Sequence, residues 1–186
     1  MESEAGGGPG AAVIGSTETG LNFYRPHARV VVLLFLAPVA YEVWWYWQLF
    51  LFTRREGFPR TQSFWWILVP IYGWIVIYRQ FDDLATADDE FRPAFSSTGA
   101  IWLVVLSQVV GNASLRIAPI PSFVAFVLSS IFIAWAGHLV QPHANNYLRR
   151  RYPDAKPLPM TTGEIVATVI GVLAFALVVL ATFAWS

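Results

Sequence analysis

The sequence predicts an all-α integral membrane protein, a bundle of five transmembrane helices joined by short connections. Hydrophobic residues make up 56% of the 186 residues and charged residues only 13%, whereas soluble domains carry roughly 25% charged residues. Several apolar segments also approach the length of about 20 residues that a helix needs to cross a bilayer. If the third of these segments is re-entrant, the bundle has four spanning helices.

Composition and motifs exclude several functional classes. Twelve basic and twelve acidic residues give no net charge, so no nucleic-acid partner is expected. The chain has no cysteine, and therefore no disulfide and no thiolate metal site. A Gly-rich phosphate loop, a nucleophile elbow and a zinc-binding His-Glu-x-x-His sequence are all missing. We therefore predict no catalytic residues, no metal and no cofactor, and the sequence favours a protein that is not an enzyme.

The N-terminal 24 residues are Gly-rich and lack the apolar run of a secretory signal. This composition predicts a disordered tail, and the first spanning helix is then the targeting signal. We expect residues 25–152 to form a membrane domain of four segments and residues 153–160 to form a Pro-rich linker. Residues 161–186 are expected to form a fifth transmembrane helix.

The first apolar segment covers residues 30–52 and contains Glu42 near its midpoint. We predict one transmembrane helix here, kinked at Pro38 because proline lacks the backbone N–H that the helix needs. A carboxylate at this depth costs at least about 2.5 kcal/mol unless it is protonated or paired. Glu42 is therefore expected to face the bundle interior, near polar atoms of the third or fourth segment.

The next two segments are less regular. Residues 63–81 are predicted to span the membrane with a bend at Pro70 and Gly73, and the acidic residues that follow are expected to form a solvated loop. Residues 97–118 are the weakest candidate for a span, because Gln108 and Asn112 dilute the apolar pattern. Pro119 then marks a tight connection.

The fourth segment, residues 122–148, carries a polar stripe and an expected kink at Pro142. Its members recur at steps of three and four, which places them on one helical face: Ser130, Ala134, Gly137, His138, Gln141 and Asn145. Small residues allow close helix contact, and polar ones form hydrogen bonds between membrane helices. Helix packing is the simpler interpretation of this stripe, with a polar pathway or ligand site as the alternative. The segment ends at Arg149, Arg150 and Arg151, expected to contact lipid headgroups.

The fifth segment begins at Thr161-Thr162-Gly163-Glu164, which fits a helix capping box. Orientation follows from basic residues, which favour the cytoplasmic side. With five spans, more Lys and Arg lie on the side of the N-terminus. We therefore expect an inner (cytoplasmic) membrane protein with a cytoplasmic N-terminus and an external C-terminus. The assignment inverts if the third segment does not span.

Three loose motifs lie between residues 30 and 150. They are the aromatic sequence Tyr41-Glu42-Val43-Trp44-Trp45-Tyr46, a second segment running from Trp65-Trp66 to Tyr78-Arg79, and a late Gln141-x-x-x-Asn145 followed by arginines. In these features the chain resembles a family of small multi-span bacterial membrane proteins of unknown function. The resemblance implies a multi-span bacterial membrane protein and assigns no activity to any residue.

The sequence therefore offers polar membrane-interior candidates and no reaction. These candidates are Glu42, Gln108, Asn112, Ser130, His138, Gln141 and Asn145. The leading interpretation is a non-catalytic structural or regulatory component with membrane lipids as partners, and a homo-oligomer or a larger membrane complex is also compatible. The alternative is a small transporter or channel subunit that uses Glu42 and the polar stripe. A membrane-embedded enzyme or haem protein is less favoured, because His138 and His143 on one helix point in different directions.

Overall fold

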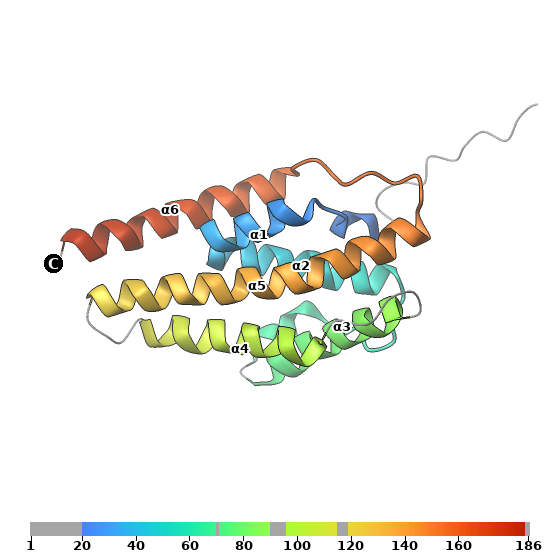
Figure 1. Ribbon diagram of the computed structural model, residues 1–186, viewed down its shortest axis with the longest axis horizontal. Helices are drawn as coiled ribbons and strands as arrows, with labels where there is room; N and C mark the ends of the chain where they lie inside the picture. Colours follow the sequence, from blue (N-terminus) through green and yellow to red (C-terminus); the bar gives the residue numbers. More distant parts are fainter. Residues whose placement is uncertain (1–19, 70, 90–95, 115–118, 185–186) are drawn as a thin grey trace, which may run out of the picture.

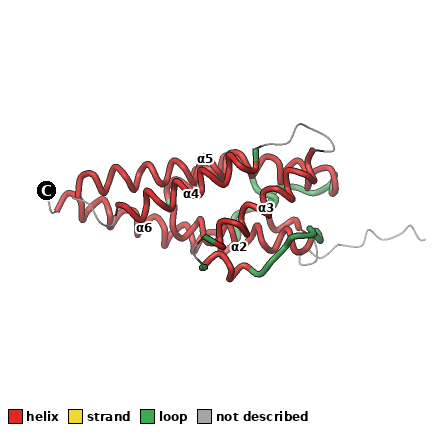
Figure 2. Tube along the Cα trace, turned by 90° about the horizontal axis from the view of Figure 1, so that it is seen from below, coloured by secondary structure: helices red, strands yellow, loops and turns green. Residues whose placement is uncertain are grey.

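A computed structural model describes residues 20–69, 71–89, 96–114 and 119–184. These residues are helical or irregular, with no strand among them. Helices α4, α5 and α6 run side by side, and α1, α2 and α3 pack along one half of α5 (Figures 1 and 2). Most of the predicted N-terminal tail lies outside the described residues. Its end is ordered, however, since Gly20–Phe23 form a short 3₁₀ turn and Phe23 is fully buried.

The first predicted span is a helical hairpin. Helix α1 covers His27–Leu36, and α2 begins again at Pro38 and ends at Arg55. Ala37 between them is non-helical, with φ −133° and ψ 53°, and Asn22 donates hydrogen bonds to Gln48 across the hairpin. The prediction of one kinked helix over residues 30–52 is therefore wrong. Pro38 has no N–H to continue α1, and it occupies instead the first turn of a new helix, where none is needed.

The second predicted span is also divided. A 3₁₀ helix, Phe64–Leu68, precedes α3, Tyr72–Asp89. The corner between them requires Gly73, since a Cβ there would lie 2.5 Å from the Ile67 carbonyl oxygen. Pro70, which we expected to contribute to the bend, lies outside the described residues. The corner shortens the apolar helix that a span requires.

Helix α3 continues into the acidic stretch that we expected to be a loop. Asp83 and Asp88 are buried. Asp83 pairs with Arg60, and Asp88 pairs with His143 and Arg150. Ion pairing within the protein replaces hydration of these carboxylates, so the helix extends to Asp89.

Helices α4 (Ser97–Ser114) and α5 (Pro119–Arg151) pack antiparallel. Helix α5 is longer than predicted and continues through Pro142. Proline cannot donate to the carbonyl four residues earlier, that of His138. The His27 side chain of α1 lies against His138, with the two ring centroids 4.7 Å apart.

Helix α6 covers Thr162–Ala184 and follows the predicted Pro-rich linker. The linker contacts the N-terminal segment, because the Leu158 N–H donates a hydrogen bond to the Tyr24 carbonyl. Within the described residues, two stretches are long and apolar enough to cross a membrane, Pro121–Arg151 in α5 and Thr162–Thr182 in α6. The expectation of five spans is not confirmed, because α1 is short and the apolar part of the second segment is broken.

Candidate functional site

A cavity of about 490 Å³ lies where the hairpin tip meets the three long helices. We call it the Glu42 cavity. Its size falls within the range of small-molecule sites, roughly 300–1,000 Å³. The lining residues come from α2, α4, α5 and α6, and they are Pro38, Val39, Glu42, Ser107, Gln108, Gly111, Asn112, Ser114, Ser122, Phe126, Ser129, Gly171, Ala174, Phe175 and Val178.

Glu42 provides the carboxyl group of this cavity. It is half-buried and interacts with the side chains of Tyr46 and Gln108. The Gln108 carbonyl oxygen accepts a hydrogen bond from Trp74 Nε1 of α3. That contact orients the Gln108 amide so that its N–H groups are available to the carboxylate. Among the described lining residues, Glu42 alone has an ionisable side chain.

Serine side chains that line the cavity join α4 to α5. Ser107 Oγ donates to the Ser129 carbonyl at 2.9 Å, and Ser129 Oγ donates to the Ser107 carbonyl at 2.8 Å. Ser122 Oγ donates to the Ser114 carbonyl at 2.6 Å. These hydroxyl groups hold α4 against α5, as small polar residues do between membrane helices, so we assign them a packing role.

The remaining wall is apolar. The rings of Phe126 on α5 and Phe175 on α6 contact each other with centroids 5.7 Å apart, and Asn112 donates to the Gln108 backbone carbonyl at the cavity edge. Aromatic faces attract organic cations. The cavity thus combines one carboxylate, a few hydrogen-bonding groups and an apolar wall.

The predicted stripe on α5 does not line this cavity. Gln141 is fully buried, accepts a hydrogen bond from Trp45 Nε1 and donates to the Phe23 carbonyl and to Asn145. Asn145 in turn donates to the Arg25 carbonyl. Both amides therefore fix the N-terminal segment against α5.

The other two polar residues of the stripe are also separate from the cavity. Ser130 is buried and its hydroxyl donates to the Phe126 carbonyl of its own helix. His138 is exposed, with its ring centroid 4.7 Å from that of His27. No group of three or more His, Asp and Glu residues that could hold a metal ion occurs in the described part of the chain.

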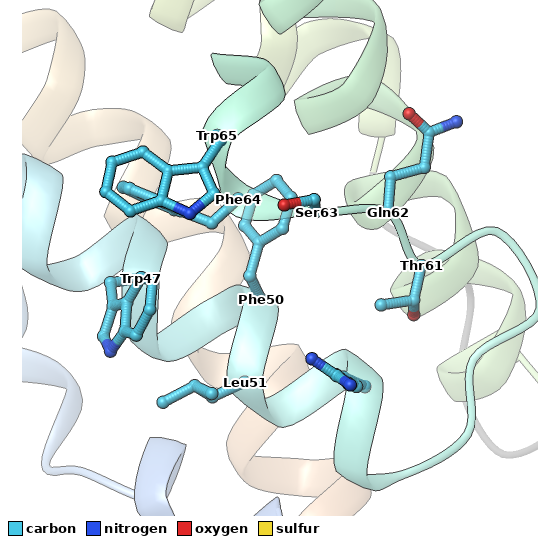
Figure 3. Close-up of a pocket in the computed structure, with 9 residues that line it drawn as sticks. Trp47, Phe50, Leu51, Thr61, Gln62, Ser63, Phe64 and Trp65 are labelled. Carbon is cyan, nitrogen blue, oxygen red and sulfur yellow. The ribbon is translucent and has the colours of Figure 1, made fainter. Parts of the chain in front are cut away.

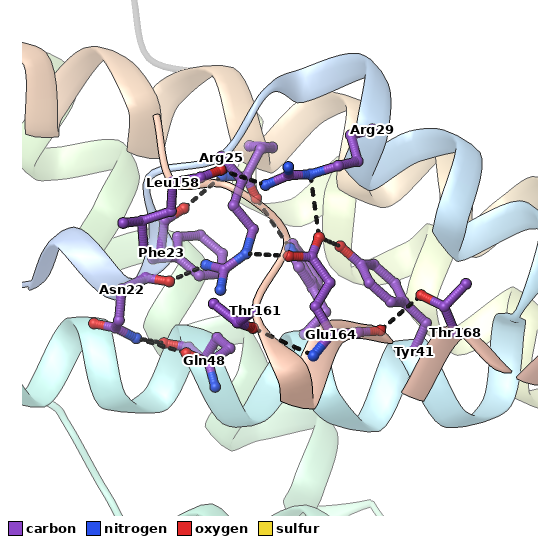
Figure 4. Close-up of polar contacts among 12 residues, drawn as sticks. Asn22, Phe23, Arg25, Arg29, Tyr41, Gln48, Leu158, Thr161, Glu164 and Thr168 are labelled. Atoms are coloured by element: carbon purple, nitrogen blue, oxygen red, sulfur yellow. Dashed lines mark hydrogen bonds and ion pairs between the residues drawn. The ribbon is translucent and has the colours of Figure 1, made fainter. Parts of the chain in front are cut away.

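A buried ionic cluster joins the N-terminal segment to α6 (Figure 4). The Glu164 carboxylate, 0% exposed, lies 3.2 Å from both Arg25 Nε and Arg29 Nε, and the Tyr41 hydroxyl donates to it. Burial lowers the pKa of Arg25, and the charge of Glu164 opposes that effect. The cluster fixes both arms of the hairpin to the start of α6.

The same cluster corrects the predicted capping box. The Glu164 N–H does donate to Thr161 Oγ1, at 3.3 Å. The Glu164 carboxylate, however, contacts the two arginines instead of the Thr161 backbone. Hydrogen bonds and ion pairs with two guanidinium groups stabilise a buried carboxylate more than a hydrogen bond from one backbone N–H does.

The arginines at the end of α5 are largely engaged within the protein. Arg150 pairs with Asp88, and Arg151 Nε lies 3.0 Å from the Glu56 carboxylate. Arg149 is exposed and donates to Asn146. Nearby, hydrogen bonds to two aspartates raise the pKa of Arg60. Lipid contact by Arg149, Arg150 and Arg151 remains a prediction.

Sequence reasoning named Glu42, Gln108 and Asn112 but missed the serines and the Glu164 cluster. The serines could have been found from their spacing in the sequence. Ser107 and Ser114 are seven positions apart, and so are Ser122 and Ser129. Residues seven apart share a helical face. The pairing of Arg25 with Glu164 had no local signal, because 139 positions separate them.

No family model, curated protein or solved structure matches this chain. The resemblance to small bacterial membrane proteins therefore stays a prediction.

Proposed function

We propose that the protein is a non-catalytic integral membrane protein that binds a small organic cation in the Glu42 cavity, as a transporter or channel subunit would. The observation that carries this proposal is a carboxylate lining a cavity of about 490 Å³ beside apolar walls. A charged group away from water is costly unless a counter-charge accompanies it. A bound cation would supply that charge.

The lining favours a monovalent cation with an apolar body. Divalent metal ions prefer several oxygen ligands, usually with more than one carboxylate, whereas the described lining residues supply one. The aromatic pair Phe126 and Phe175 and the aliphatic Val39 and Val178 suit an organic substituent. The Asn112 N–H group donates to the Gln108 backbone, so the Asn112 side-chain oxygen can accept a hydrogen bond at the charged end.

The membrane setting is part of the same proposal. Helices α5 and α6 have the length and apolarity of spans, and many large apolar side chains of α6 are exposed, including Leu173, Leu177 and Leu180. Surrounding lipid would cover them. We place the protein in an inner membrane, with the N-terminus cytoplasmic and the C-terminus outside.

Binding of tetraphenylphosphonium, a lipophilic monocation, tests the site. We expect saturable binding to the detergent-purified protein by equilibrium dialysis, weakened at least tenfold in Glu42→Gln. Asp154→Asn, an exposed carboxylate of the linker, is the matched control and should bind like the wild type. Equal binding by wild type and Glu42→Gln would contradict the proposal. Uptake of the same cation into proteoliposomes separates transport from binding alone.

A structural or regulatory role is the second candidate. The observation that favours it is the buried cluster of Arg25, Arg29 and Glu164, which joins the N-terminal hairpin to α6 and stiffens the domain. Co-purification of one stoichiometric membrane partner, with no cation binding, would support this role over the first.

A further inference from the structure

The outer face of α2 carries a second, amphipathic site, which adjoins the Glu42 cavity and shares Val39 with it. Two adjoining pockets, of about 400 and 470 Å³, share Trp47 and Phe64 in their walls. We call the two together the α2 groove. Figure 3 shows the first pocket, with the rings of Trp47 and Trp65 at one side and Thr61 and Gln62 at the other.

The first pocket forms the polar end of the groove. Several hydrogen-bond donors line it, and they are available to a ligand. Arg54 lines it, is exposed, and has no ion-pair partner among the described residues. Gln62 accepts a hydrogen bond from the Tyr72 hydroxyl, which leaves its amide N–H groups to donate. Ser63 adds a hydroxyl. A guanidinium, an amide and a hydroxyl together match a phosphate group.

The second pocket forms the apolar end, between α2 and α6. It is lined by Ala40, Trp44 and Ile170, among others. Val39, Val43 and Trp47 recur at four-residue steps along α2 and are 61%, 51% and 39% exposed. From Val39 to Arg54 the helix rises about 22 Å. One ligand could therefore place a charged head at Arg54 and an extended apolar chain along this stripe.

We propose that the α2 groove is a binding site for an anionic phospholipid, with its phosphate at Arg54, Gln62 and Ser63 and an acyl chain along Val39 and Val43. The inference depends on the membrane setting of the proposed function but not on cation binding at Glu42. Tryptophans at the head-to-tail boundary fit this occupant, because their rings favour the membrane interface. A soluble phosphorylated molecule would leave the apolar half of the groove empty.

Native mass spectrometry of the delipidated, detergent-purified protein tests the proposal. We expect phosphatidylglycerol to bind more tightly than phosphatidylcholine with the same acyl chains. Arg54→Gln should weaken phosphatidylglycerol about fivefold, the effect of one basic residue at an anionic surface, and should scarcely change phosphatidylcholine. Arg55→Gln removes the same charge from the neighbouring position and is the matched control.

A second variant tests the apolar half. Ala40→Phe fills the pocket between α2 and α6 and should weaken both lipids, while glycerol 1-phosphate, which has the head without the tail, should bind poorly to every variant. Equal loss in Arg54→Gln and Arg55→Gln would overturn the assigned headgroup position. Arg54-dependent binding of glycerol 1-phosphate as tight as that of the lipid would identify a soluble ligand instead. A well-resolved monodisperse peak for each variant on gel filtration verifies folding.

Discussion

Gly171 of α6 lies directly against Ala37, the residue at which the first predicted span reverses. A Cβ atom on Gly171 would be 2.3 Å from the Ala37 Cβ and 2.8 Å from its Cα. The hairpin tip therefore packs backbone to backbone on α6, and Pro38, which follows it, lines the Glu42 cavity. The depth of Glu42 in the protein depends on this contact.

Gly171→Ala should destabilise the protein by about 1–3 kcal/mol, because the added methyl group overpacks a contact that has no room for it. The hairpin tip would be pushed from α6. Thermal unfolding in detergent, followed by circular dichroism, measures the loss. Ala176→Val adds volume to an exposed position of the same helix and should change stability by less than about 0.5 kcal/mol. An unchanged melting temperature in Gly171→Ala would contradict the packing described.

Glu164→Gln should cost about 3–5 kcal/mol, because it leaves Arg25, 2% exposed, without its counter-charge. Denaturant unfolding of the purified protein measures this. Arg149→Gln, which changes an exposed arginine, should be nearly neutral. The double variant Arg25→Gln/Glu164→Gln should be less destabilised than the sum of the two single variants; strict additivity would show that the pair is not coupled.

His27 lies against His138, and we predict that its side chain compensates for the donor that Pro142 lacks, which would couple the two positions. His27→Ala should destabilise the wild-type chain by about 1 kcal/mol, because the His138 carbonyl loses a partner that Pro142 cannot replace. In the Pro142→Ala background the helix regains its own donor, so the same substitution should cost much less. A double-mutant cycle on unfolding free energies gives the answer, and equal costs in the two backgrounds would argue against the compensation.

The ends of α6 should lie on opposite sides of the membrane. Because the chain has no native cysteine, Asp154→Cys and Ala184→Cys each introduce a single thiol. In intact spheroplasts, a membrane-impermeant maleimide should label Cys at 184 readily and Cys at 154 only after lysis. Labelling of both thiols before lysis would show that α6 does not span.

Much of the architecture was predictable because it depends on local pattern. The helical class, the start of α6 near Thr162 and the linker that precedes it follow from apolar runs and prolines that act on their own neighbours. Glu42, Gln108 and Asn112 were recognisable as candidates, since a charged or amide side chain within an apolar run stands out. Their gathering at one cavity with Ser122 and Ser129 was not recognisable.

The errors have a common cause. Pro38 is compatible with both a kinked helix and a reversal of the chain. A reversal forms only if another element can pack against the hairpin tip. Gly171, far along the sequence, provides that contact at Ala37. The acidic residues in the last turns of α3 were expected in a solvated loop because their partners Arg60, His143 and Arg150 are distant in sequence. Periodicity reports which face of a helix is polar, but not what that face meets.

The sequence by itself determined that this protein is helical and rich in apolar segments, because backbone hydrogen bonding and side-chain hydrophobicity act within a few residues along the chain. Only the tertiary structure decided that the first segment folds back as a hairpin, that Glu164 is neutralised by Arg25 and Arg29, and that Glu42 lines a cavity. These outcomes depend on the free energy of contacts between residues separated by most of the chain. No local property of either partner encodes such a contact.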